Sequence, residues 1–259
     1  MKKGIFDASS FFFSSYPTKT MERVQDEWPS FYERLTKDLF FCRKETVVDM
    51  RDMPLQRVEK VIEHFIEYSR YETYVDEWTM TTEEGSPYVM ITWTYERPKW
   101  QVLYERYVVK RKAQRILHQV TTEQMTTEEK VKALYTYVVT HFLYDEVLDE
   151  CSEGIDTYGY HPSNTAYGVL TTKKGVCEGF ARLFVILFDL LSIPNYYVVG
   201  RSEEEGHAWN LLKVNGRYVH FDVTDDLSTA RKKEKVTYNY FLIDSSRVSH
   251  QWKKKQYPN

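Results

Sequence analysis

Three residues in the second half of the chain have the side-chain types needed for thiol-dependent acyl transfer: Cys177, His207 and Asp222. A cysteine thiol becomes a strong nucleophile when a histidine accepts its proton, and a carboxylate can fix the tautomer of that histidine. Such a group attacks a carbonyl carbon and forms a thioester. This chemistry requires structural elements that bring the three side chains together.

Cys177 lies at the start of a predicted buried helix. The run 180–191 is apolar on nearly every side, and Pro194 marks its end. Unpaired backbone N–H groups and the positive end of the helix dipole favour a thiolate at this position. Gly175 and Gly179 flank the cysteine without side chains, which lets a substrate backbone approach closely.

A predicted hairpin brings His207 and Asp222 to one face of a sheet. Strands are expected at 196–199, 208–214, 218–223 and 238–243. Asn215-Gly216 is a strong signal for a two-residue turn. Pairing outward from that turn places Trp209 opposite Asp222 and His207 opposite Thr224, so His207 and Asp222 are diagonal neighbours.

Three segments together resemble the active-site blocks of the transglutaminase-like superfamily. They are Gly175-Val176-Cys177-Glu178-Gly179-Phe180-Ala181, Gly206-His207-Ala208-Trp209-Asn210 and Phe221-Asp222-Val223-Thr224. Their order and short spacing also match those of the family. The resemblance extends upstream through residues 127–142 and Leu170, and it covers roughly residues 125–243.

The resemblance implies an α+β, papain-like core with a buried helix against an antiparallel sheet. It implies Cys177 as nucleophile, His207 as base and Asp222 as the group that orients the histidine. Animal transglutaminases have an aromatic residue after the cysteine and an upstream tryptophan that holds the oxyanion. This sequence has Glu178 and the stretch 163–167 in the comparable places, so the second oxyanion donor stays open.

Residues near the predicted site are expected to bind substrate. The candidates are Ser163, Asn164, Tyr167 and Trp209, with Tyr144 and His161 as further residues on the acyl-binding side. The backbone N–H of Cys177 is the expected first oxyanion donor, and a side chain from 163–167 the second. Trp209 either shields the ion pair from water or fills the core.

Three alternatives remain open at this level. His220 shares the predicted face with Asp222 and competes as the base, although a structural role for it fits better. A zinc site from Cys177, His207, His220 and Asp222 is conceivable, but paired close ligands are absent, so neither a metal nor another cofactor is expected. Cys42 and Cys151 can form a disulfide only if their Cα atoms come close.

The elements upstream of the site divide the chain into an N-terminal accessory α/β region, 1–120, and a catalytic domain, 121–259. Periodicity predicts helices at 55–68, 100–118 and 127–142 and a strand around 88–93. Thr126 followed by Glu129 is a helix-start signal. Residues 145–164 are mostly polar and are expected to form a loop that borders the site.

Composition excludes several classes of protein. The chain has 259 residues, of which 42% are hydrophobic and 28% charged, as in soluble globular proteins. A net charge of -3 gives no electrostatic reason to expect nucleic acid as a partner. No apolar run is long enough to span a membrane, and no signal peptide is evident, so the localisation stays open between cytoplasmic and secreted after processing.

The sequence therefore predicts an acyl-transfer enzyme acting on amides, of the cysteine peptidase or amidase type. The expected substrate is a protein or peptide, with cell-wall peptides included. Water is favoured as acyl acceptor because Glu178 and the polar segment 145–164 suit a wet site. The alternatives are a protein-glutamine cross-linker that uses a lysine as acceptor, and a binding module whose triad is closed off.

Overall fold

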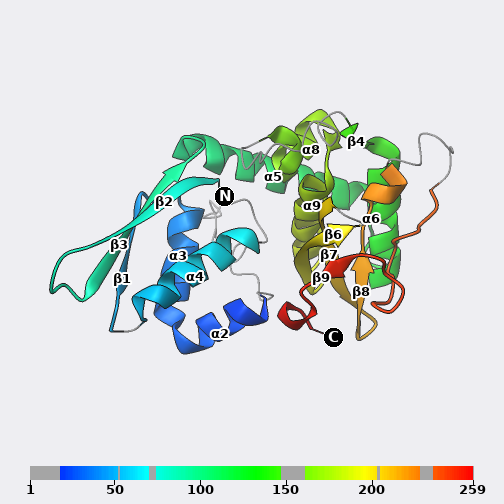
Figure 1. Cartoon of the computed structure of the whole chain (residues 1–259). Coiled ribbons are helices and arrows are strands. Elements are labelled where there is room, and N and C mark those ends of the chain that lie inside the picture. The colour runs from blue at the N-terminus through cyan, green and yellow to red at the C-terminus, as the bar shows by residue number, and fades with distance from the viewer. Residues whose placement is uncertain are drawn as a thin grey trace.

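The computed structural model describes residues 18–51, 53–69, 74–146, 161–202, 205–227 and 236–258. The fold is α+β, with helices packed against antiparallel sheets (Figure 1). Cys151 and most of the polar segment predicted at 145–164 lie outside the described residues.

The helices and strands alternate in an irregular order along the chain. The helices are α2 (Lys19–Glu27), α3 (Pro29–Phe40), α4 (Leu55–Glu67), α5 (Lys99–Val120), α6 (Thr127–His141), α8 (Ala166–Thr172) and α9 (Cys177–Leu190), with the 3-10 turns η1 (Pro162–Asn164) and η2 (Lys254–Gln256). The strands are β1 (Glu45–Asp49), β2 (Val75–Thr82), β3 (Tyr88–Tyr95), β4 (Leu143–Tyr144), β5 (Lys174–Gly175), β6 (Asn195–Ser202), β7 (Glu205–Val214), β8 (Arg217–Phe221) and β9 (Gln251–Trp252).

The N-terminal part is built on a three-stranded antiparallel sheet in the order β1-β3-β2. Helices α2, α3 and α4 lie beside this sheet (Figure 1). Apolar residues at helical spacing on α4 and at alternate positions on β3 point into one shared core, as their periods require. Buried members of this N-terminal core include Met21, Leu35, Val58, Ile62, Val89, Ile91 and Trp93.

The C-terminal part has a four-stranded antiparallel sheet in the order β8-β7-β6-β9, and α9 packs against β6 and β7. Alternate residues of the strands face opposite sides, so Tyr197 and Leu212 join the core around α9, whereas Val198 and Trp209 join a smaller cluster on the other face. The side chain of Asn210 donates to the Ala181 carbonyl and ties β7 to α9 at 3.0 Å.

Helix α5 connects the two parts (Figure 1). In its first half, Val102 is buried in one cluster with Cys42. In its second half, Val109, Ala113 and Ile116 belong to the core around α9. We propose that the chain be divided into units 1–120 and 121–259, with α5 as the last helix of the first unit and its second half packed against the core of the second.

The sequence predictions for the helices are confirmed. The helices expected at 55–68, 100–118 and 127–142 correspond to α4, α5 and α6 with shifts of at most two residues at each end. Thr126 accepts the N–H of Glu129, and the Glu129 carboxylate accepts the N–H of Thr126, which is the capping box.

The hairpin register is confirmed from the turn to Asn210, but the expected pairs Trp209–Asp222 and His207–Thr224 are not part of the ladder. Val214 pairs with Arg217 across the Asn215-Gly216 turn, and both turn residues have positive φ, at 50° and 80°. The ladder runs in the predicted register as far as Asn210 opposite Phe221. It ends there, so Asp222 follows β8 rather than lying within it.

The strand predicted at 238–243 is wrong. Tyr238 and Leu242 have left-handed backbones, with φ of 58° and 53°, which interrupts an extended strand. The segment still lies beside β8, because His220 and Ile243 exchange N–H···O bonds as an isolated bridge. The edge position beside β6 belongs instead to β9, an element that the sequence analysis missed.

Two further observations bear on the sequence analysis. Cys42 is a buried free thiol, so the disulfide alternative for it is wrong. Within the described ranges, no helix combines the length and apolar character needed to cross a membrane.

Candidate active site

Cys177 is the first residue of α9, as predicted, and it is partly exposed. The preceding strand β5 pairs in parallel with β4, which fixes the entry of the chain into the helix. The N–H of Val176 donates to the Ser163 carbonyl at 3.0 Å, so η1 lies against the start of α9. The first N–H groups of a helix have no acceptor within it, so a negative charge on the cysteine or its substrate is favoured there.

His207 is held on β7 between the thiol and a carboxylate. Its Nε2 atom lies 2.7 Å from Asp222 Oδ2, and Cys177 is close enough to affect its pKa. Since Nε2 faces the aspartate, Nδ1 is the nitrogen left for the thiol. Burial disfavours the charged imidazole, but the hydrogen bond with Asp222 and the nearby Cys177 outweigh it and raise the pKa of His207 to about 11.

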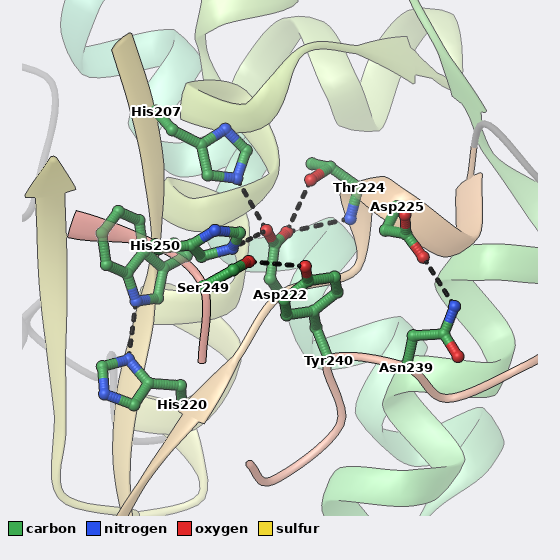
Figure 2. A network of polar contacts seen from close by, with 10 residues as sticks. His207, His220, Asp222, Thr224, Asp225, Asn239, Tyr240, Ser249 and His250 are labelled. Atoms are coloured by element: carbon green, nitrogen blue, oxygen red, sulfur yellow. Dashed lines mark hydrogen bonds and ion pairs between the residues drawn. The ribbon is translucent and has the colours of Figure 1, made fainter. Parts of the chain in front are cut away.

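Asp222 is a buried carboxylate that accepts hydrogen bonds on both oxygens (Figure 2). The Thr224 N–H and hydroxyl donate to Oδ1 at 2.9 and 2.7 Å, while His207 and His250 contact Oδ2. Burial by itself raises the pKa of this carboxyl group. The hydrogen bonds from His207 and His250 hold the pKa well below its usual range, so the group is ionised.

Trp209 lies behind His207. Its indole is 1% exposed and stacks on His207 with ring centroids 5.8 Å apart. Its Nε1–H donates to Nδ1 of His220 at 2.8 Å. The tryptophan therefore fills the core and also covers one face of the histidine, which combines the two roles considered for it.

His220 does not compete for the role of base within this geometry. It is buried, and both ring nitrogens have partners, Trp209 at Nδ1 and Ser245 at Nε2. Burial lowers its pKa to about 4, with the neighbouring His250 acting in the same direction. A neutral imidazole with two structural hydrogen bonds follows from this environment.

The residues expected to bind substrate differ in how far their side chains are exposed. Ser163 is buried, and its hydroxyl donates to Asp145 Oδ2 at 2.5 Å. Asn164 and Tyr167 are half-buried, and Tyr167 packs against the core around α9. His161 is exposed and accepts the N–H of Ser163 at Nδ1.

Glu178, the residue after the nucleophile, is engaged along the helix. Its carboxylate pairs with Arg182 one turn later at 2.9 Å. Arg182 also donates to the Ser69 carbonyl and lies over the ring of Tyr197. This pairing neutralises a charge that otherwise disfavours a thiolate at Cys177.

His250 was missed by the sequence analysis. It lies directly before β9 and is 5% exposed, and its Nε2 is 3.2 Å from Asp222 Oδ2. It is 28 residues from Asp222 in the chain and belongs to no recognisable motif, so no sequence signal marked it.

His207, Asp222 and His250 are the group within the described residues that could hold a metal ion, with ligand atoms within 4.8 Å of one another. A metal would take the Nε2 lone pairs that now belong to N–H groups donating to Asp222. It would also occupy the proposed base. The hydrogen-bonded arrangement therefore suits proton transfer better than metal binding.

Residues 114–223 match the family model of the transglutaminase-like superfamily. This segment belongs to that superfamily. The match is less than half of the chain but contains Cys177, His207 and Asp222, and it confirms the resemblance stated from the three sequence blocks. None of the curated proteins matches the chain.

Two solved structures are similar to the chain that carries this transglutaminase-like segment. One is described as a crystal structure of a TGase, with 19% identity, a TM-score of 0.43, and coverage of 66% of this chain and 50% of that one. The other is a candidate cysteine protease from Cytophaga hutchinsonii, with 18% identity, a TM-score of 0.35, and coverage of 57% and 61%. The chain thus spans about half of the first protein and three fifths of the second, and these similarities carry no functional argument.

Gly179 offers a test of how η1 supports the transglutaminase-like site. A Cβ atom there would lie 2.3 Å from the Ser163 carbonyl oxygen, so Gly179→Ala should displace η1 from α9. We expect a loss of about 1–3 kcal/mol in the free energy of unfolding, although alanine is the better helix former. Urea unfolding measures this.

The matched control for that substitution is Gly206→Ala. A Cβ atom at Gly206 meets nothing within 4 Å, and its φ lies outside the left-handed region. Its stability should stay within about 0.5 kcal/mol of the wild type. A Gly179→Ala protein as stable as this control would show that η1 does not depend on close contact at that position.

Proposed function

We propose that the chain is a thiol-dependent enzyme that cleaves amide bonds by acyl transfer to water, as a cysteine peptidase or amidase. The observation that carries this proposal is the position of His207, close enough to Cys177 for the two groups to interact electrostatically and hydrogen-bonded to the buried carboxylate of Asp222. A nucleophile, a base and a group that orients the base thus occur in one connected arrangement.

The geometry supports a two-step reaction. Because the pKa of His207 is raised, Nδ1 already holds the proton of Cys177, and the thiolate attacks the amide carbonyl while Asp222 stabilises the imidazolium. When the tetrahedral intermediate collapses, His207 returns the proton to the leaving amine and a thioester remains. Water then attacks the thioester with His207 as base, which releases the carboxylic acid and restores the thiol.

The start of α9 supplies one site for the oxyanion. The N–H of Cys177 is the first donor, because first-turn N–H groups of a helix are available to an anion. Asn164 is our candidate for the second. It follows Ser163, whose carbonyl is bonded to the N–H of Val176, so its backbone lies beside the helix start.

The side-chain amide of Asn164 supports this assignment. Its Oδ1 atom is buried and has no hydrogen-bond partner among the described residues. A half-turn of the amide about its terminal bond exchanges the oxygen and the NH2 group, which places an N–H donor at the same point. Ser163 is less suited, because its hydroxyl is committed to Asp145.

Asn164→Ala should lower kcat about 100-fold and change KM little, since an oxyanion donor acts in the transition state. Hydrolysis of p-nitrophenyl acetate, an activated ester, is a suitable assay. The control is Asn239→Ala, which removes an exposed amide that bonds to Asp225 instead. Wild-type kcat in Asn164→Ala would remove this residue from the oxyanion site.

The substrate is proposed to be a protein or peptide, including peptides of the cell wall. Tyr167 and Asn164, both half-buried, are the candidates for contact with it, whereas Ser163 and Trp209 support the site from within. The partial exposure of Cys177 favours an accessible nucleophile over a closed binding module. We propose water as the main acceptor over a lysine amine.

The test is incubation with a peptide library and cell-wall fragments in the presence of a labelled primary amine. Wild type and Cys177→Ala are compared by mass spectrometry. We expect new free acids with the wild type only. Amine adducts that exceed free acids would favour the cross-linker, and products that persist in Cys177→Ala would remove Cys177 as the nucleophile.

A further inference from the structure

The C-terminal segment of the chain is built into the candidate active site. Strand β9 pairs with β6, with Trp252 opposite Gly200 and Gln251 opposite Arg201. A Cβ atom on Gly200 would lie 2.1 Å from the Gln251 carbonyl oxygen, so the absence of a side chain there allows this close approach. The segment therefore has a fixed position against the sheet that carries His207.

The end of the same segment is also anchored. Tyr257 is 1% exposed and packs with Tyr68 and Tyr196 on the face of the sheet opposite α9. Its hydroxyl accepts the N–H of Val199 at 3.5 Å. The pairing of β9 with β6 and the burial of Tyr257 therefore also restrict the residues that directly precede β9 in the chain.

His250, directly before β9, is confined by aromatic rings. Tyr240 stacks on it with centroids 4.8 Å apart and planes at 10°, and His207 and Trp209 each lie 4.9 Å away. These contacts fix the plane of the imidazole. They also direct its Nε2 atom toward Asp222, at 3.2 Å from Oδ2 (Figure 2).

The hydrogen bonds define the tautomer of His250. An ionised carboxylate only accepts hydrogen bonds, so the nitrogen that faces Asp222 must carry the proton. Nδ1 is buried and has no hydrogen-bond partner within the described part of the chain. An unpaired N–H at this position would cost more than an unpaired lone pair, so Nδ1 carries no proton. His207 also presents Nε2 to the same oxygen, at 2.7 Å.

We propose that His250 is a positioning residue for the proposed acyl-transfer reaction. Its Nε2–H group donates to Asp222 Oδ2 and holds the carboxylate in the orientation that receives His207. This inference rests on the proposed function of the site and extends it to the C-terminal segment. His250 contacts neither Cys177 nor a substrate in this arrangement, so its effect reaches the reaction through Asp222.

The tautomer can be measured in the wild-type protein without any substitution. Selective 15N labelling of histidine distinguishes Nε2–H from Nδ1–H imidazoles by the nitrogen chemical shifts. We expect His250 in the form with its proton on Nε2. A His250 that carries its only proton on Nδ1 would overturn the proposal.

The contribution to the reaction is measured with two variants of similar size. His250→Met removes the donor, and we expect kcat for p-nitrophenyl acetate to fall about tenfold at unchanged KM, because a charge-assisted hydrogen bond acts on the step through Asp222. His250→Gln restores an N–H donor at a similar distance and should recover most of the loss. Gln251→Ala, which shortens the exposed side chain of the residue next to His250, should keep the wild-type kcat.

Three results distinguish failure of this inference from failure of the proposed function. If His207→Ala abolishes turnover while His250→Met has wild-type kcat, His250 has no positioning role but the triad stands. If His207→Ala also has wild-type kcat, the proposed function fails and the inference with it. Activity lost to a chelator and restored by Zn²⁺ would make His250 a metal ligand and overturn the proposal.

Discussion

Replacing Asp222 by asparagine is expected to lower kcat about 10³- to 10⁴-fold. The aspartate accepts donors at both oxygens, His207 and His250 at Oδ2 and Thr224 at Oδ1. An asparagine has one accepting oxygen, so its NH2 group must face a donor on one side. If the NH2 group faces His207, Nε2 must accept its hydrogen bond. The imidazole then carries its proton on Nδ1, which can no longer accept the thiol proton. If the NH2 group faces Thr224, it meets a backbone N–H, which is also a donor.

Ester hydrolysis by purified Asp222→Asn and wild-type protein measures this loss. Asp225→Asn is the matched control, because Asp225 is close in the chain but bonds to Asn239 on the surface (Figure 2). The control should retain wild-type kcat. An Asp222→Asn protein within tenfold of the wild type would mean that the carboxylate does not set the tautomer of His207.

The same pair of residues sets a pH window for stability. The lowered pKa of Asp222 contributes stability above its unfolded pKa of about 4, and that contribution is lost as the pH falls. The raised pKa of His207 contributes fully below its unfolded value of about 6.5 and is lost as the pH rises toward about 11. Urea unfolding should show the largest stability difference between wild type and Asp222→Asn near roughly pH 5 and a smaller one near roughly pH 8. Equal differences would contradict the charged pair.

Cys177 should react with iodoacetamide about 100-fold faster than Cys42 at mildly acidic pH. Cys177 is partly exposed at a helix start and is close enough to His207 for the two groups to interact electrostatically. Cys42 is buried, and burial raises the pKa of its thiol although Arg106 opposes the shift. Peptide mapping by mass spectrometry after short exposures gives the two rates separately.

His207→Ala is the informative variant for this reactivity. It should bring the labelling rate of Cys177 down toward that of an ordinary thiol, since no neighbouring base then takes the proton. Labelling of Cys177 that stays fast in His207→Ala would assign the reactivity to the helix start alone. Equal rates for Cys177 and Cys42 in the wild type would remove any activation.

The parts of the fold that were predictable from sequence are those set by local rules. The helix after Gly175 and the Asn215-Gly216 turn depend on apolar periodicity and on positive φ, which neighbouring residues determine. The register then follows from the turn between Val214 and Arg217. His207 and Asp222 lie just beyond the last pair of this ladder, where their side chains are in contact.

The parts that were not predictable depend on contacts between distant segments. Strand β9 has two residues and no alternating pattern, and it forms because Gly200 leaves room for its backbone. His250 reaches Asp222 only through that pairing. The 238–243 segment shows the reverse error, because its apolar residues suit a strand while Tyr238 and Leu242 turn the backbone.

The most direct test of the account is to trap the acyl group on the enzyme. Wild-type protein is mixed with p-nitrophenyl acetate, quenched in acid within a single turnover, and examined by intact-protein mass spectrometry with peptide mapping. We expect one acetyl group on Cys177, formed much more slowly in His207→Ala and Asp222→Asn and absent from Cys177→Ala. Acetylation at other residues, or at the wild-type rate in Cys177→Ala, would contradict the proposal that Cys177, His207 and Asp222 act together in acyl transfer.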